Sequence, residues 1–78
     1  MGTIRLTAGS PNSTATVTTT AARAGNSMVF VSYMLPSGTP GVIFVRDSDI
    51  SNGSFIIKSN STTDTSYVNW WVISHSPY

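Results

Sequence analysis

The sequence predicts an all-β protein, a small antiparallel and jelly-roll-like β-sandwich of five to six or more short strands. Short runs of β-branched and aromatic residues recur along the chain, and clusters of turn residues separate them. Helix signals are almost absent, and no connection between the expected strands is long enough to hold a crossover helix, so a parallel sheet is not expected. The length of 78 residues leaves room for a single domain, 1–78.

The first half of the chain contains two expected strands. Residues 14–20 are rich in β-branched threonine and valine and lack an apolar helical period, which favours an exposed strand. Residues 21–24 have the composition for one helical turn, but Gly25 and Asn26 follow at once and favour a turn. Residues 28–35 predict a strand that is apolar on both faces, and the segment from 36 to 41 ends it in a tight reversal.

The second half contains two more strands before the chain reaches its last one. Residues 42–46 predict a returning strand that is again apolar on both faces. Residues 47–53 form the next turn, which ends in Asn52-Gly53, the strongest short signal for a β-hairpin. Residues 54–59 then predict a strand, and the polar segment 60–64 connects it to the final one.

The final strand, residues 64–74, contains both tryptophans of the chain. Side chains of a strand alternate between its two faces, so Trp70 and Trp71 point in opposite directions. A domain of this size has one core, and the second apolar face is therefore expected to pack against neighbouring subunits. We expect a closed homo-oligomer, with a homotrimer as the favoured form. The residues expected in the core or in this interface are Phe30, Tyr33, Phe44, Phe55, Trp70 and Trp71.

The composition excludes several classes of protein. Cysteine is absent, which excludes disulfides and thiolate metal sites, and a single histidine without any glutamate argues against zinc. Charged residues make up only 9% of the chain, against about 25% in ordinary domains. A net charge of +1 provides no basic surface for nucleic acid, and no apolar run is long enough for membrane insertion. We expect no cofactor and no metal.

The turns contain the candidate binding residues. Asp47, Asp49 and Asn52 offer oxygen atoms that suit hydroxyl groups or calcium, but the segment lacks the bidentate acid and the glycine placement of a calcium-binding helix-loop-helix motif. Asp64 in the connector is a further polar candidate, and Tyr67 is a candidate for stacking on a sugar ring. Turn formation alone is the favoured explanation of the polar residues, and packing in a core or interface is the favoured explanation of the aromatic ones.

Catalysis has little support in the sequence. A glycan hydrolase needs paired carboxylates, and the chain has only Asp47, Asp49 and Asp64, two of which project from one turn. His75 near the C-terminus has no nucleophile or orienting acid in a recognisable pattern around it, so an exposed tail histidine is the favoured explanation. The protein is predicted not to be an enzyme.

The series of segments at 29–32, 41–45, 53–59 and 64–70 is similar to small β-domains at the C-termini of bacteriophage tail fibres, tailspikes and related virion proteins. The resemblance spans residues 14 to 74 and rests on spacing and on the ending Thr-Ser-x-Val-Asn-Trp. It implies a compact β-sandwich that trimerises, caps a fibre and sometimes contacts the host surface, and it assigns no catalytic residue to this chain.

The predicted function is therefore a non-enzymatic structural module of the virion that trimerises and caps or registers a tail fibre or spike. Its expected partners are other copies of itself and, at the host surface, a glycan. The alternative is a carbohydrate-binding, lectin-like module. A native start and a fragment of a longer fibre protein are both compatible with Met1-Gly2.

Overall fold

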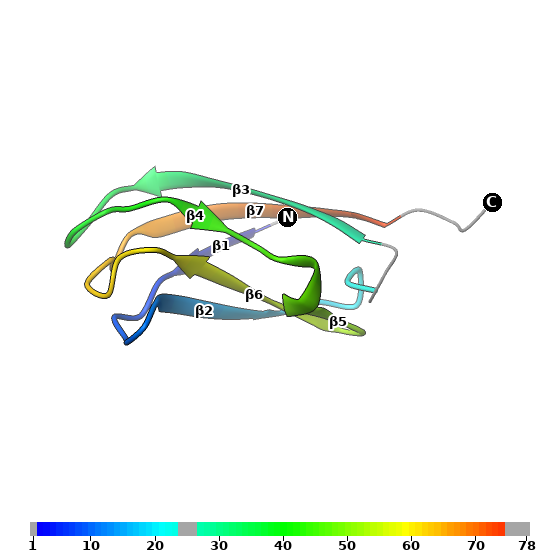
Figure 1. The fold of residues 1–78 in the computed structure, drawn as a ribbon. Helices are drawn as coiled ribbons and strands as arrows, with labels where there is room; N and C mark the ends of the chain where they lie inside the picture. The colour runs from blue at the N-terminus through cyan, green and yellow to red at the C-terminus, as the bar shows by residue number, and fades with distance from the viewer. Residues whose placement is uncertain (1, 24–26, 75–78) are drawn as a thin grey trace.

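Two antiparallel sheets face each other in the computed structural model, which describes residues 2–23 and 27–74 (Figure 1). This arrangement confirms the predicted all-β fold. The elements in this part of the chain are β1 (Gly2–Arg5), β2 (Ser13–Thr18), β3 (Ser27–Leu35), β4 (Ile43–Phe44), the 3₁₀ helix η1 (Asp47–Asp49), β5 (Ile50–Ser51), β6 (Ser54–Ser59) and β7 (Tyr67–Ser74).

Each sheet is organised around one central strand. The first sheet, which we call sheet A, has the order β1-β7-β3, so the terminal strand lies in its middle. The second, sheet B, has β6 in its middle, with β2 on one edge and both β4 and β5 on the other. In Figure 1, β3, β7 and β1 form the upper layer, and β2 and β6 form the lower one. The chain passes from one sheet to the other repeatedly, which ties the two layers together.

The core lies between the sheets and is built by strict alternation along the strands. Phe55 and Ile57 of β6 and Val68 of β7 have no exposed surface. Trp70 of β7 also points inward, and its ring meets the Phe55 ring edge-on with the centroids 5.5 Å apart. The buried apolar residues are Leu6, Ala15, Val17, Ala22, Ile50, Phe55, Ile57 and Val68.

The Thr-rich segment is not an exposed strand, as its composition had suggested. In β2, Ala15 and Val17 are buried in the core and Ser13 is buried beside them, while Thr16 and Thr18 face solvent. The strand alternates between buried and more exposed positions, and the buried positions are occupied by the smaller side chains of serine, alanine and valine. Small residues suffice there because β2 pairs with β6, whose larger side chains fill the space between the sheets.

Two other strands also differ from expectation. The segment 42–46 pairs with β6 only at Ile43 and Phe44, because the chain then leaves the edge of sheet B to form η1. Sequence analysis did not predict β1, which pairs with β7 from Gly2 to Arg5. Its polar composition gives no local strand signal, and it is held instead by the edge that β7 offers.

The hairpin predicted at Asn52-Gly53 is present between β5 and β6. Ile50 pairs with Phe55, and Ser51 pairs with Ser54, which leaves a two-residue loop. Gly53 has a φ of +92°, a backbone conformation that favours glycine. The turn expected at Gly25 and Asn26 lies outside the described residues.

The first prediction concerns the core. Phe55→Ala removes the largest fully buried side chain, so we expect the free energy of unfolding to fall by about 3–5 kcal/mol in urea titrations followed by circular dichroism. Val42→Ala is the matched control, because Val42 is 64% exposed and its loss is expected to change stability by less than about 0.5 kcal/mol. Equal losses for the two variants would contradict this assignment of the core.

Candidate functional site

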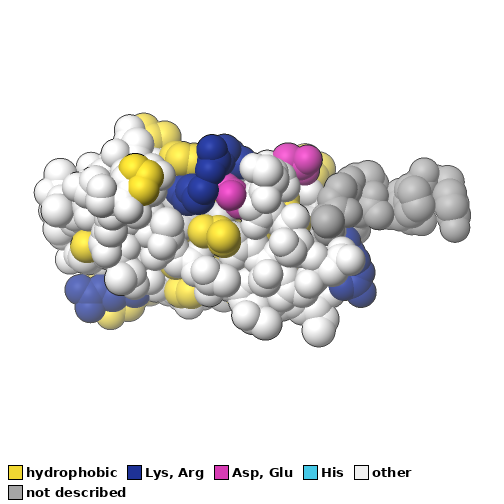
Figure 2. Space-filling view, turned by 60° about the horizontal axis from the view of Figure 1, so that its bottom comes forward, with side chains coloured by type: hydrophobic (Ala, Val, Ile, Leu, Met, Phe, Trp, Pro, Cys, Tyr) yellow, Lys and Arg dark blue, Asp and Glu magenta, His cyan; other side chains and the backbone are white. Residues whose placement is uncertain are grey.

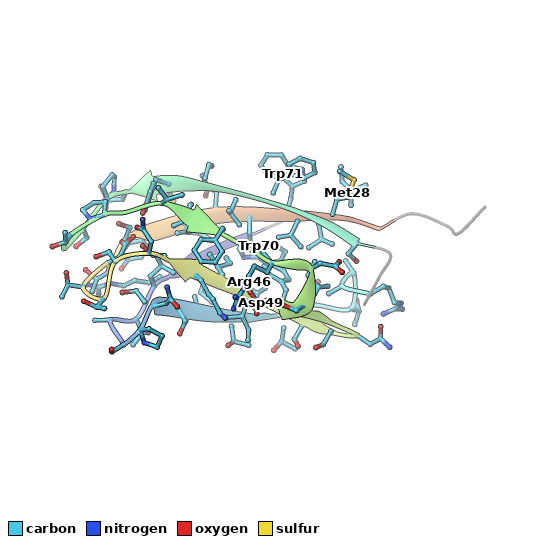
Figure 3. All side chains as sticks on the ribbon, in the orientation of Figure 1. Met28, Arg46, Asp49, Trp70 and Trp71 are labelled. Atoms are coloured by element: carbon cyan, nitrogen blue, oxygen red, sulfur yellow. The ribbon has the colours of Figure 1, made fainter. Side chains whose placement is uncertain are left out.

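The side of sheet A that points away from sheet B carries most of the exposed large apolar side chains of the described chain. We call this side the outer face. Figure 3 shows Trp71 and Met28 projecting from it, whereas Trp70 points between the sheets. The outer face consists of Thr3 and Arg5 of β1, Met28, Phe30, Ser32 and Leu35 of β3, and Tyr67, Asn69, Trp71 and Ile73 of β7.

One end of the outer face is entirely apolar. Phe30 and Trp71 are directly opposite each other on β3 and β7, and their rings stack with centroids 5.2 Å apart and planes 16° from parallel. Met28 and Ile73 form the next cross-strand pair and are 54% and 49% exposed. Pairs of this kind stabilise the sheet locally, yet they leave a broad hydrophobic surface in contact with water.

The middle of the outer face is polar. Thr3, Asn69 and Ser32 lie side by side on β1, β7 and β3, and we call them the polar rung. The Thr3 hydroxyl donates a hydrogen bond to Asn69 Oδ1 over 3.1 Å. The polar rung therefore separates the apolar end from the rest of the face.

The other end of the outer face combines an aromatic ring with the only charge on this face. Tyr67 lies between Arg5 of β1 and Leu35 of β3. The Arg5 guanidinium lies over the Tyr67 ring at 5.5 Å from its centroid, a cation–π arrangement, and it also donates to the Thr65 carbonyl. Tyr67, a predicted stacking residue, thus presents one flank of its ring to a cation of the same chain.

Asp64 is not at a surface, although its place in a polar connector suggested that a ligand could reach it. The residue has no exposed area. Its Oδ2 accepts from the Tyr33 hydroxyl at 2.5 Å and from the Ser59 hydroxyl at 2.7 Å, and its Oδ1 accepts from the Ser66 backbone at 3.0 Å. Gly41 adds a longer backbone contact to Oδ2. These donors occupy the carboxylate and join β3, β6 and the two long connections.

The surroundings of Asp64 keep it ionised. Burial alone raises the pKa of Asp64, but hydrogen bonds from Ser66, Tyr33 and Ser59 outweigh burial and lower that pKa to about 2. The same contact acts oppositely on its partner, since burial and the hydrogen bond to Asp64 raise the pKa of the Tyr33 hydroxyl. Within the described residues no buried polar side-chain atom lacks a hydrogen-bond partner. This cluster is therefore a completed structural network.

Asp49 is also occupied by groups of the same chain. Its carboxylate lies 3.3 Å from Arg46 Nε and 3.3 Å from Lys58 Nζ, and its side chain is 8% exposed. Burial opposes ionisation, but the two cations prevail and lower the pKa of Asp49. Figure 2 shows basic and acidic side chains gathered in one cluster on the face turned to the viewer, which is otherwise mostly uncharged.

The predicted binding residues are not brought together in one site. Asp47 and Asn52 are exposed near the β5 edge of sheet B, and Asp49 lies close to them in η1. Tyr67 is on the outer face of sheet A, and Asp64 is inside the molecule. His75 lies outside the described residues. Among the residues that are described, no three potential metal ligands cluster. Helical segments in the same residues fall short of the length and apolar character of a membrane span.

The predicted aromatic residues fall into two groups. Phe55, Trp70, Tyr33 and Phe44 are buried or half-buried, whereas Phe30 and Trp71 are 37% and 40% exposed on the outer face. Sequence reasoning did not anticipate the polar rung or the serines around Asp64. The available signal was strand alternation, since Asn69 and Ser32 each stand between large apolar or aromatic residues two positions away in the chain.

Comparison with known proteins places the domain in a family. Residues 1–73 match the family model described as the C-terminal domain of K1 capsule-specific polysaccharide lyase. The match spans nearly the whole chain, and the protein therefore belongs to this family, which derives from a phage tailspike. The matched family covers a C-terminal domain of the lyase, in agreement with the class that the sequence resembles. No curated protein and no solved structure matched the chain.

The second prediction concerns Asp64. Its pKa is near 2 in the folded protein and near 3.8 when unperturbed, so the unfolded chain takes up the proton first as the pH falls. We expect the free energy of unfolding to drop by about 2 kcal/mol between pH 4 and pH 2. Asp64→Asn is expected to remove most of this pH dependence. It should also lower the free energy of unfolding by about 1–3 kcal/mol at pH 7, because the NH₂ group of the asparagine amide would face the hydrogen-bond donors that surround the carboxylate.

Chemical denaturation at a series of pH values tests this prediction. Asp49, whose pKa is also lowered, will leave a residual slope in the Asp64→Asn protein. Asp47→Asn is the control for the loss of one carboxylate, since Asp47 is exposed in the same chain. If the Asp64→Asn protein kept the full slope, Asp64 would not be the group responsible.

Proposed function

We propose that the domain is a non-enzymatic structural module of a phage tailspike or tail fibre that trimerises and caps or registers the spike within the virion. Membership of a tailspike C-terminal family supports the structural role. The observation that carries the proposal of self-association is the outer face of sheet A, where apolar side chains of β3 and β7 lie in contact with water.

The size of this face supports association with a macromolecule. Its six large apolar or aromatic side chains are 37–58% exposed. With about 150–250 Å² for a side chain of this size, they expose on the order of 500 Å². The polar rung divides this area into two parts, and one partner in a standard interface contributes about 800 Å² in total. The outer face, completed by its polar residues, thus has the dimensions of a subunit contact.

The carboxylates of the chain support a non-enzymatic role. Asp64 is enclosed by hydrogen-bond donors, Asp49 forms ion pairs with two cations, and Asp47 is exposed at the surface. Acid–base cleavage of a glycan requires two carboxyl groups on either side of the scissile bond. Asp64 and Asp49 are already engaged by groups of the same chain, and the matched family describes a C-terminal domain of the lyase.

A trimer at the end of a spike has a clear physical use. Three identical chains that meet at one end raise the local concentration of the segments to which they are connected. The remaining chain can then assemble in a fixed register instead of by independent encounters. A domain that closes through an apolar face provides such a clamp without any bound ligand.

The third prediction tests this interface. In light scattering at micromolar concentration we expect a mass of about 25 kDa, three times the 8.3 kDa of one chain. Trp71→Ser should shift the mass toward the monomer and leave the far-ultraviolet circular dichroism unchanged, because Trp71 lies outside the core. Val42→Ser is the control, since it removes an exposed apolar side chain elsewhere and should leave the mass unchanged. A wild-type mass near 8 kDa would overturn the proposal.

Carbohydrate binding is the second candidate, and one observation favours it. The stacked rings of Phe30 and Trp71 keep part of their aromatic surface exposed next to the polar rung, and aromatic rings beside polar groups suit the apolar face and the hydroxyls of a sugar. A host-surface glycan is the ligand this candidate implies. A glycan array probed with wild-type and Trp71→Ser protein separates the two functions. A domain that serves only in assembly should bind no glycan in either form, whereas a carbohydrate-binding domain should bind as the wild type and lose binding in Trp71→Ser.

A further inference from the structure

We propose that the polar rung of Thr3, Asn69 and Ser32 fixes the register in which copies of this chain pack their outer faces together. The inference rests on the proposed self-association and adds to it a specificity-determining residue, Asn69. In the assembled protein, the Asn69 amide would hydrogen bond to the polar rung of a neighbouring copy.

The position of the polar rung is the first observation. It crosses the outer face between the apolar end, with Phe30 and Trp71, and the end that contains Tyr67. Any partner that covers both ends must also cover the rung. Asn69 is already half-buried in the isolated chain, because neighbouring side chains of the face surround it.

The hydrogen-bonding capacity of the polar rung is the second observation. Asn69 Oδ1 accepts from Thr3, but in the described part of the chain its Nδ2 group donates to no acceptor, and the Ser32 hydroxyl has no bonded partner there. Water serves these groups while the face is exposed. Once the face is covered, each unpaired donor weakens association.

These two observations together imply a choice of register. Apolar contacts are non-directional, so the surface around Phe30, Trp71, Met28 and Ile73 tolerates several relative positions of two copies. The polar rung tolerates only those positions in which its donors meet acceptors. A single buried asparagine has this effect in coiled coils, where it selects one register and one oligomeric state and lowers stability.

A second copy of the chain is the partner that this surface fits. An amide contains both a donor and an acceptor and is therefore complementary to another amide, and serine and threonine hydroxyls share this property. The outer face has one charged group, Arg5, and that group is engaged with Tyr67 and the Thr65 carbonyl. No charge pattern on the face calls for an oppositely charged partner, and the exposed area approaches what one subunit contributes to an interface.

The test compares Asn69→Leu with the wild-type protein in native mass spectrometry and in amide correlation spectra. We expect the wild type to show one mass and one set of resonances. Asn69→Leu should associate at least as tightly, because a polar group leaves the interface, but it should show several masses or several sets of resonances. Thr16→Leu is the control, since it adds the same side chain to the exposed face of sheet B and should retain one mass and one set.

Each outcome bears on the inference. A single mass and a single set for Asn69→Leu, identical to an oligomeric wild type, would overturn the register proposal and leave self-association intact. A folded, monomeric Asn69→Leu would also overturn it, because the rung would then supply affinity and not register. A monomeric wild type would overturn the proposed function itself. Should Asn69→Leu fail to fold, Ser32→Val removes a polar group of the same rung from β3 and is expected to broaden the distribution in the same direction.

Discussion

The buried carboxylate of Asp64 is the interaction on which the rest of the structure depends. An ionised group without contact with water is tolerated only if donors replace the lost solvent, and here Tyr33, Ser59 and Ser66 supply them. These donors come from β3, from β6 and from the segment that leads into β7. The network therefore fixes where the last connection enters sheet A. The groups that form it all precede β7 in the chain.

That entry point determines which side chains of β7 face the core and which face outward. A shift of one residue in a strand exchanges the side chains of its two faces. Because Ser66 is held by Asp64 and is itself buried, Tyr67 must begin the strand outward and Val68 inward, and the alternation then places Trp70 on the core and Trp71 on the outer face. A polar cluster thus determines which tryptophan packs in the core and which one lies on the outer face.

Local sequence predicted the elements that have a complete pattern of their own. The strands predicted at 28–35 and 54–59, the Asn52-Gly53 hairpin and the division of the two tryptophans follow from strand patterning and turn chemistry, and the structure contains them as β3, β6 and the β5–β6 turn. The burial of Asp64 could not be predicted in this way, because the Tyr33 hydroxyl that encloses it comes from another strand, 31 positions away in sequence. β1 escaped prediction for the same reason, as pairing with β7 stabilises it. For Asp47, Asp49 and Asn52 the sequence indicated turns, and the structure adds that cations already hold Asp49.

The weak charge of the chain influences how the outer face works. Charged residues are 9% of the sequence, and the outer face has only Arg5, so electrostatic steering cannot bring copies together rapidly. The described part of the chain has a core of eight buried apolar residues, and the sequence lacks cysteine, so the stability of the isolated domain is limited. In the proposed assembly, association through the apolar face would address both limits, provided that the copies are held close to one another. High effective concentration would then replace steering, and burial of the outer face would enlarge the apolar interior available to each chain. Under those conditions selectivity would have to come from hydrogen-bond geometry, and the polar rung places donors and acceptors across the middle of this face.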